Sequence, residues 1–168
     1  MFCPQCGQPS LQTVQAQREF RCVCGFHFFL NVALGVAAII QCGEHILVTR
    51  RAGDPGKGML DFPGGFVEPA ESMEQGLCRE LAEELGLVVT PDALRWIGSA
   101  PNLYPYDGVT YHTCDGYFHL QLATRPALTS MDDVASFAWL LPAEIDPATF
   151  AFDSSRSGWQ QFLAASQP

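Results

Sequence analysis

The sequence predicts a mixed α/β or α+β domain preceded by a small cysteine-rich unit. Residues 1–30 contain four of the seven cysteines, and the rest of the chain alternates short apolar runs with Gly- and Pro-rich turns. Helical patterns occur in only a few places, chiefly in the middle and near the end. With 168 residues and 48% hydrophobic residues, the chain can bury one substantial core and carry a small appendage. We therefore expect one unit over residues 1–31 and a larger domain over 32–168.

The predicted strands are short runs rich in β-branched or aromatic residues and bounded by turn residues. The first, 32–41, is followed by the turn Cys42-Gly43-Glu44 and by a second strand at 45–50. A loop rich in Gly and Pro then leads to a short extended segment at 59–62. Further strands are expected at 87–90, 94–99, 111–122 and 136–140.

The central helix is predicted over residues 72–85. Ser72 is a good N-cap, and Gly86 is the residue type that ends a helix. A short helix is expected over 142–145, and a last helix, capped by Asp153 or Ser154, through Ala165. Strands around one central helix, followed by a final helix, indicate a mixed α/β or α+β fold.

Composition excludes several classes of partner. The net charge of −9 and the pI near 4.7 argue against a nucleic-acid backbone or an anionic membrane as the main partner, because both select basic surfaces. The most apolar run, 32–40, is too short to span a bilayer. The segment MFCPQCGQ lacks the basic and apolar regions of a signal peptide. We therefore expect a cytoplasmic protein with a small-molecule partner.

The most informative feature is a cluster of carboxylates on the central helix. Glu80, Glu83 and Glu84 are three and four positions apart, which places them on roughly one helical face. Like charges at this spacing repel and weaken an isolated helix. Hard divalent cations take oxygen ligands of this kind, so the cluster indicates a metal site. Taken alone, it is also compatible with a solvated helix face.

Other residues near this helix have plausible roles. The loop 60–65 ends in paired glycines, so its backbone can approach a ligand closely and a carbonyl at Gly65 can join the metal ligands. Glu71 can pair with Arg79, on a different face from Glu80, and pin the loop to the helix. Arg50 and Arg51 end a strand and can hold a phosphate, although one of them is as easily a solvated strand end.

These residues spell a pattern that resembles the Nudix box, with every defined position filled: Gly65, Glu71, Arg79-Glu80-Leu81, Glu83-Glu84 and Gly86-Leu87. The resemblance covers about residues 33–150. It implies an α/β/α sandwich around a mixed sheet and hydrolysis of a nucleoside diphosphate linked to another moiety, with Mg²⁺ or Mn²⁺. It also implies that Gly65, Glu80, Glu83 and Glu84 bind the metal and that Glu71 and Arg79 are a supporting ion pair. Glu83 is our first candidate for the catalytic base.

The four early cysteines form two close pairs, Cys3 with Cys6 and Cys22 with Cys24. Four thiolates in two pairs suit a tetrahedral structural Zn²⁺. The segment resembles the zinc ribbon of NADH pyrophosphatase-like Nudix enzymes, but its second pair is CxC instead of CxxC. All four cysteines can bind zinc, His27 can replace Cys22, or the ribbon can be metal-free.

The substrate is less well defined. Residues 99–106 lie where Nudix subfamilies carry specificity signals, and Tyr104 can stack on a base or ribose, although such rings are more often core. We expect an ADP-ribose-like or NADH-like substrate. The alternatives are a dinucleoside polyphosphate, a nucleoside triphosphate, or a nucleotide-sensing protein without turnover. Family resemblance also suggests a homodimer, with the apolar run near Phe28 and Phe29 as a candidate contact.

Overall fold

The computed structural model describes residues 1–15, 18–130 and 134–166. The chain forms two compact units, Met1–Val32 and Ala33–Pro168. Each unit is described by itself below.

The first unit is a three-stranded antiparallel sheet in the order β1-β2-β3. Its strands are β1 (Gln12–Gln15), β2 (Glu19–Arg21) and β3 (His27–Phe29). Among its described side chains only Cys3, Phe20 and Cys22 are buried, and Phe28 and Phe29 are exposed. So small a core rarely sustains a fold, since units below about 40 residues usually need disulfides, metals or oligomerisation.

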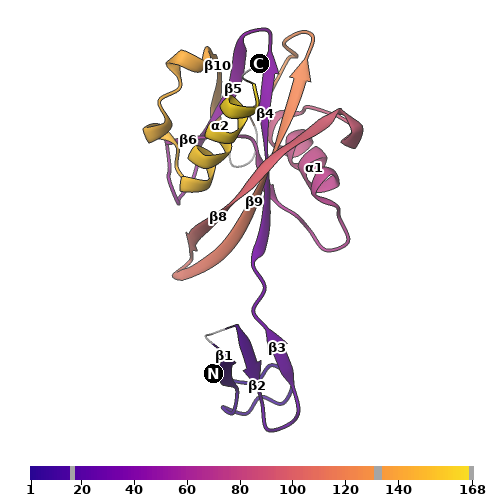
Figure 1. Cartoon of the computed structure of the whole chain (residues 1–168), viewed down its shortest axis with the longest axis vertical. Coiled ribbons are helices and arrows are strands. Elements are labelled where there is room, and N and C mark those ends of the chain that lie inside the picture. Colours follow the sequence, from indigo (N-terminus) through magenta and orange to yellow (C-terminus); the bar gives the residue numbers. More distant parts are fainter. Residues whose placement is uncertain (16–17, 131–133, 167–168) are drawn as a thin grey trace. The chain divides into compact units, whose positions relative to one another are not determined.

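The second unit is built on a mixed sheet in the order β10-β5-β4-β9-β8 (Figure 1). β4 and β9 pair in parallel, and the other neighbours pair antiparallel. Two short strands extend the sheet, because β6 pairs with β5 and β7 pairs with β4. The strands are β4 (Ala33–Cys42), β5 (His45–Arg51), β6 (Leu60–Asp61), β7 (Gly64–Phe66), β8 (Leu94–Tyr106), β9 (Val109–Leu122) and β10 (Val134–Leu140).

Two helices, α1 (Met73–Leu85) and α2 (Asp153–Ala165), cover opposite faces of this sheet. Successive residues of β4 point to opposite faces. Ala38 and Ile40 therefore pack in the cluster that contains Leu77, Leu81 and Leu85 of α1. Ile39 packs instead with Trp159 and Phe162 of α2. The predicted α/β/α arrangement around a mixed sheet is confirmed.

The strand predicted at 87–90 is wrong. After α1 the N–H of Gly86 donates to Ala82 O and the N–H of Leu87 to Leu81 O, so these groups complete the helix end. The segment then runs unpaired into the 3₁₀ turn η1 (Pro91–Ala93). Strands β8 and β9 are longer than predicted and form one hairpin, so residues 99–106 continue a strand instead of forming a loop. Pro101 and Pro105 are tolerated there because β8 is an edge strand.

The predicted cap of the last helix is also wrong. The N-cap of α2 is Phe152, which offers no side-chain hydrogen bond. The hydroxyls of Ser154 and Ser155 bind other partners, Asp115 and Asp61. The short predicted helix is present as the 3₁₀ turn η2 (Pro142–Glu144), and a further turn, η3 (Pro147–Thr149), precedes α2. In the described part of the chain, no helix is both long and apolar enough to cross a membrane.

Candidate active site

Helix α1 is fixed in rotation by its buried leucines. Leu77, Leu81 and Leu85 recur every four residues and are fully buried against the sheet. The helix begins with a capping box, in which Ser72 accepts from the N–H of Gln75 and Gln75 bonds back to the N–H of Ser72. This anchoring leaves the carboxylates of the second half of α1 at the edge of the apolar contact.

Arg79 is the centre of the acidic cluster. Its guanidinium donates to both oxygens of Glu71, at 2.9 and 3.1 Å. It also donates to Glu80 at 2.8 Å, to Glu83 at 3.0 Å and to the carbonyl of Phe66 at 2.9 Å. The sequence predicts Arg79 on a different helical face from Glu80, but its long side chain reaches Glu80 and Glu83 as well as Glu71. One fixed cation therefore already offsets part of the repulsion between these carboxylates.

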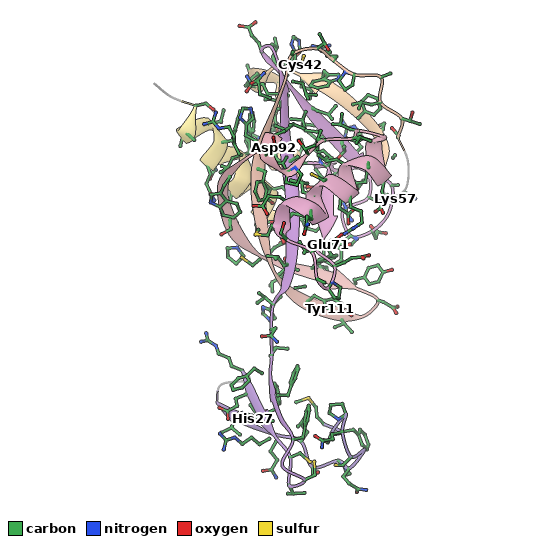
Figure 2. The ribbon with its side chains drawn as sticks, turned by 90° about the vertical axis from the view of Figure 1, so that its right-hand side faces the viewer. His27, Cys42, Lys57, Glu71, Asp92 and Tyr111 are labelled. Atoms are coloured by element: carbon green, nitrogen blue, oxygen red, sulfur yellow. The ribbon has the colours of Figure 1, made fainter. Side chains whose placement is uncertain are left out.

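Glu71 lies in the segment before α1 (Figure 2), and its ion pair with Arg79 ties this segment to the helix. The Arg79 guanidinium, together with the N–H of Glu68, lowers the pKa of the Glu71 carboxyl. In return, the hydrogen bond to Glu71, followed by those to Glu80 and Glu83, raises the pKa of Arg79 against a smaller effect of burial. Both groups are therefore charged at neutral pH.

The lowered pKa of Glu71 predicts a pH-dependent loss of stability. Its contribution is fully present above the unfolded pKa of about 4.3 and is lost as pH falls through the lower folded pKa. We expect Glu71→Gln to lower the free energy of unfolding at pH 7, and the difference from wild type to shrink below about pH 4. Urea denaturation at pH 7, 5, 4 and 3 measures this. Glu44→Gln, in the exposed turn between β4 and β5, is the matched control and should follow wild type.

Glu84 and the glycine-rich loop are joined directly. Glu84 is buried, and its Oε2 accepts a hydrogen bond of 2.9 Å from the N–H of Gly64. Gly64 has a φ of 149°, and a Cβ there would collide with the backbone of Val36 and Ala37. A Cβ on Gly65 would lie 2.5 Å from the Glu80 carboxylate. Gly64 is therefore required for the loop to pack against β4, and a side chain at Gly65 would displace the Glu80 carboxylate.

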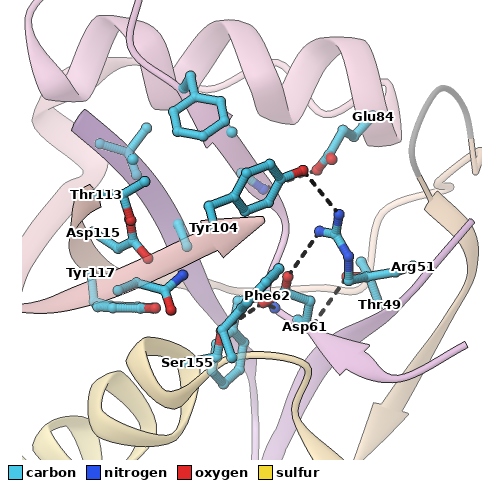
Figure 3. Close-up of a pocket in the computed structure, with 18 of the residues that line it drawn as sticks. Thr49, Arg51, Asp61, Phe62, Glu84, Tyr104, Thr113, Asp115, Tyr117 and Ser155 are labelled. Carbon is cyan, nitrogen blue, oxygen red and sulfur yellow. Dashed lines mark hydrogen bonds and ion pairs between the residues drawn. The ribbon is translucent and has the colours of Figure 1, made fainter. Parts of the chain in front are cut away.

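A pocket opens beside this loop, and Gly65 lines it together with Glu84, which is labelled in Figure 3. Arg51 and Tyr104 lie in the same wall. The Arg51 guanidinium donates to Asp61 at 3.3 Å and to the Tyr104 hydroxyl at 3.4 Å, and it stacks 5.0 Å from the centre of the Phe152 ring. The structure thus brings two of the three predicted substrate-binding residues together. It does not place Arg50 in this wall, because the Arg50 guanidinium donates to the carbonyl of Gly58.

The four early cysteines meet in the first unit. Their sulfur atoms all lie within 4.8 Å of one another, with Cys3–Cys24 at 3.8 Å and Cys6–Cys22 at 3.6 Å. A tetrahedral zinc site with Zn–S bonds of about 2.3 Å has sulfur atoms ~3.8 Å apart, so these distances fit it. Cys22 belongs to the cluster despite the short CxC spacing. His27 does not, and its Nε2 lies 2.6 Å from Glu19.

Charge crowding in this cluster favours a cation. Hydrogen bonds from the Cys24 N–H and the Ser10 hydroxyl lower the pKa of Cys22 to about 6. The N–H of Phe26 lowers the pKa of Cys24, but the Cys22 sulfur, desolvation and the other two sulfurs outweigh it and raise that pKa to about 12, so a second thiolate is disfavoured. A divalent cation among the sulfurs would remove this penalty, because thiolates are the form that binds metal.

A comparison with protein-family models identifies the family of this chain. The model of the NUDIX domain matches residues 30–158, which is most of the chain. The chain belongs to the NUDIX family. The resemblance inferred from residues 65–87 is therefore confirmed.

Among curated NUDIX relatives, the ADP-ribose pyrophosphatase of Methanocaldococcus jannaschii is 36% identical over 80 residues, 48% of this chain and 47% of that protein. The NAD-capped RNA hydrolase NudC of Pseudomonas aeruginosa is 27% identical over 168 residues, 94% of this chain and 57% of that protein. The chain thus spans about half the length of these relatives. A NUDIX hydrolase structure from Nitrosomonas europaea has a TM-score of 0.71 at 21% identity, covering 99% of this chain and 94% of that one.

Several residues of the NUDIX pocket were not predicted. Asp61, Thr113 and Asp115 line it, and Ser154 and Ser155 at the start of α2 donate to Asp115 and Asp61 at 2.7 and 2.8 Å.

Burial raises the pKa of Asp61. Hydrogen bonds from Ser155 and from the N–H of Phe62, together with the nearby Arg51 charge, oppose this rise but do not cancel it. A signal for Asp115 was present, since it is the one acidic residue within the long strand β9. Asp61 and the serines carried no comparable signal.

Proposed function

We propose that this protein is a Mg²⁺- or Mn²⁺-dependent pyrophosphohydrolase that cleaves a nucleoside diphosphate linked to another moiety, with an ADP-ribose-like or NADH-like molecule as substrate. The observation that carries the proposal is the junction of Glu84 with Gly64 at the wall of the pocket. Glu84 lines the pocket together with Gly64 and Gly65, so one carboxylate of α1 borders a space that suits part of a nucleotide. The named activities of the two curated relatives support the same class of substrate.

The donor set at this junction is all oxygen, which suits Mg²⁺ or Mn²⁺. We propose that Glu80, Glu83, Glu84 and the Gly65 carbonyl hold the metal, which would neutralise the charge that builds on the phosphoryl oxygens and acidify a water. Glu83 is half exposed, so water can reach its carboxylate, and it remains our first candidate for the base that receives a proton from the attacking water. Arg79 and Glu71 act as positioning residues, because they hold Glu80, Glu83 and the loop carbonyl of Phe66 in place.

Arg51 is the best-placed residue for binding the substrate's phosphate. Its guanidinium is held between Asp61, Tyr104 and the Phe152 ring, so little side-chain freedom is lost when it binds an anion. We propose that Arg51 binds a phosphate and that Tyr104 contacts the nucleoside. Arg50, bonded to a loop carbonyl on the other side of the strand, stays a weaker candidate.

For the first unit we propose a structural zinc bound by Cys3, Cys6, Cys22 and Cys24, with the ribbon over 1–31 and the hydrolase domain over 32–168. The sulfur distances support this arrangement over the one with His27. The homodimer with a contact near Phe28 and Phe29 remains a prediction.

A substrate panel tests the proposed function. Purified protein with Mg²⁺, and separately with Mn²⁺, is incubated with ADP-ribose, NADH, a dinucleoside polyphosphate and a nucleoside triphosphate. We expect a nucleoside monophosphate product from ADP-ribose or NADH at a kcat/KM at least tenfold above the other two, and none with EDTA. Preferred cleavage of the triphosphate or polyphosphate would support the alternative specificities. Tight binding of one nucleotide without any product would favour a sensing protein.

A further inference from the structure

The pocket contains a buried hydroxyl group without a hydrogen-bond partner in the described part of the chain. Thr113 is 3% exposed, and its Oγ1 has no hydrogen-bond partner among the residues that the structure describes. Leaving a buried hydroxyl unpaired costs free energy, and native proteins rarely keep such groups without a reason. Because Thr113 lines the pocket, a ligand is the natural partner for this hydroxyl.

Asp115 lies two residues further along β9 and therefore on the same face of the sheet (Figure 3). Its Oδ2 accepts from Ser154 at 2.7 Å, which fixes the orientation of the carboxylate. Its Oδ1 faces the backbone of the neighbouring strand, where a Cβ on Gly35 would lie only 2.5 Å away. Gly35 is thus the residue that leaves room for Asp115 in the floor of the pocket.

Aromatic rings form the other wall. Tyr104 lies edge-on to Phe66, with ring centres 5.5 Å apart, and 5.6 Å from the Phe152 ring. All three rings line the pocket, whose cavity volume is about 130 Å³. This is well below the roughly 300–1,000 Å³ of pockets that enclose a whole drug-sized ligand, so the pocket suits one flat part of a nucleotide. Aromatic walls favour a base over a ribose, since every base presents a π-face.

We propose that Asp115 and Thr113 select a nucleobase that carries an exocyclic amine, such as adenine, over one that carries a carbonyl at that position, such as hypoxanthine. An ionised carboxylate only accepts hydrogen bonds, whereas a hydroxyl both donates and accepts. Asp115 would accept from the amine, and Thr113 would donate to an adjacent ring nitrogen. A carbonyl oxygen at the amine position would face the carboxylate oxygen and be repelled. This inference rests on the proposed function and names the base that the same site prefers.

The test compares ADP-ribose with its hypoxanthine analogue, inosine diphosphate ribose, in the full-length protein with Mg²⁺. We expect wild type to prefer ADP-ribose by about 10- to 100-fold in kcat/KM, the range for one well-made pair of contacts to a base edge. In Asp115→Asn the amide keeps an acceptor for Ser154 but can donate to the carbonyl, so the preference should fall to about onefold or invert. Equal kcat/KM for both substrates in wild type would overturn the inference and leave the proposed hydrolase intact.

Thr113→Val separates a ligand-binding role from a structural one. The substitution removes a hydroxyl that has no partner in the described structure, so the melting temperature should stay level or rise, while KM for ADP-ribose should increase several-fold. An unchanged KM would count against the inference. Thr113→Ser, which keeps the hydroxyl, should retain the wild-type KM.

Binding of the products distinguishes failure of this inference from failure of the proposed function. Calorimetric titration with AMP and with IMP needs no turnover. Tighter binding of AMP by wild type, reduced in Asp115→Asn, supports the inference even if no tested substrate is cleaved. Equal affinity for AMP and IMP would overturn it whatever the activity.

Discussion

Replacing Glu84 with Gln is expected to lower kcat by about a thousandfold or more, since metal neutralisation of phosphoryl charge supplies several kcal/mol to the transition state and each 1.36 kcal/mol is tenfold in rate. Gln retains an oxygen that can accept from the Gly64 N–H, so the loop should stay joined to α1. What disappears is the negative charge, and with it much of the affinity for Mg²⁺. Initial rates with ADP-ribose across a Mg²⁺ titration measure the loss.

Glu74→Gln is the matched control, because it makes the same change on the same helix. Glu74 lies in the first turn of α1 and accepts from the Ser72 hydroxyl at 2.9 Å, away from the pocket wall. Its variant should keep kcat within about twofold of wild type, as expected for a surface change. Both variants should unfold within a few degrees of wild type. A Glu84→Gln protein that retains full activity would show that this carboxylate is not a metal ligand.

Removal of zinc is expected to unfold the first unit. Its described side chains bury only Phe20 besides two cysteines, so packing cannot hold the three short strands together. Structural zinc contributes an apparent free energy of about 10–16 kcal/mol in zinc-finger peptides, far more than this core can supply. Elemental analysis should find about one zinc per chain in wild type and little in Cys6→Ser. Limited proteolysis should then cut within residues 1–32 of the variant.

Cys42→Ser is the control for the cysteine chemistry. Cys42 ends β4 and is partly exposed, outside the sulfur cluster. Its variant should keep the zinc and resist proteolysis like wild type. Wild-type protein free of zinc, with an intact first unit, would contradict the proposed site.

The sequence predicted the parts of the site that depend on local spacing. Fixed intervals along one helix and its entry loop identified the carboxylates, the arginine and the glycines: Glu80, Glu83, Glu84, Arg79, Gly64 and Gly65. Such intervals predict positions in space because a regular helix converts a given sequence spacing into a given direction of the side chain. The ends of α1 were equally predictable, since Ser72 and Gly86 act on the backbone next to them.

The rest of the pocket depends on strand register, which the sequence does not reveal. Thr113 faces Asn102 across β8 and β9, and Asp115 lies beside Gly35 in the parallel pairing with β4. Thr113 and Asn102 share one hairpin whose register must be known, and Gly35 and Asp115 lie on strands far apart in sequence. Ser154 was read as a helix cap because that is the commonest use of serine before a helix. In the structure, the Ser154 hydroxyl instead donates a hydrogen bond to Asp115, which is distant in sequence.

The two serines at the start of α2 link the residues of the pocket to the attachment of the last helix. Ser154 and Ser155 anchor the last helix to Asp115 and Asp61, the same carboxylates that shape the floor of the pocket. A substitution of Asp115 that leaves Ser154 without an acceptor would change the pocket and also loosen the attachment of α2, whereas Asp115→Asn keeps an acceptor for that hydroxyl. A pocket variant that removes this acceptor would therefore need a second change at the start of α2 to keep the helix attached as firmly as in wild type.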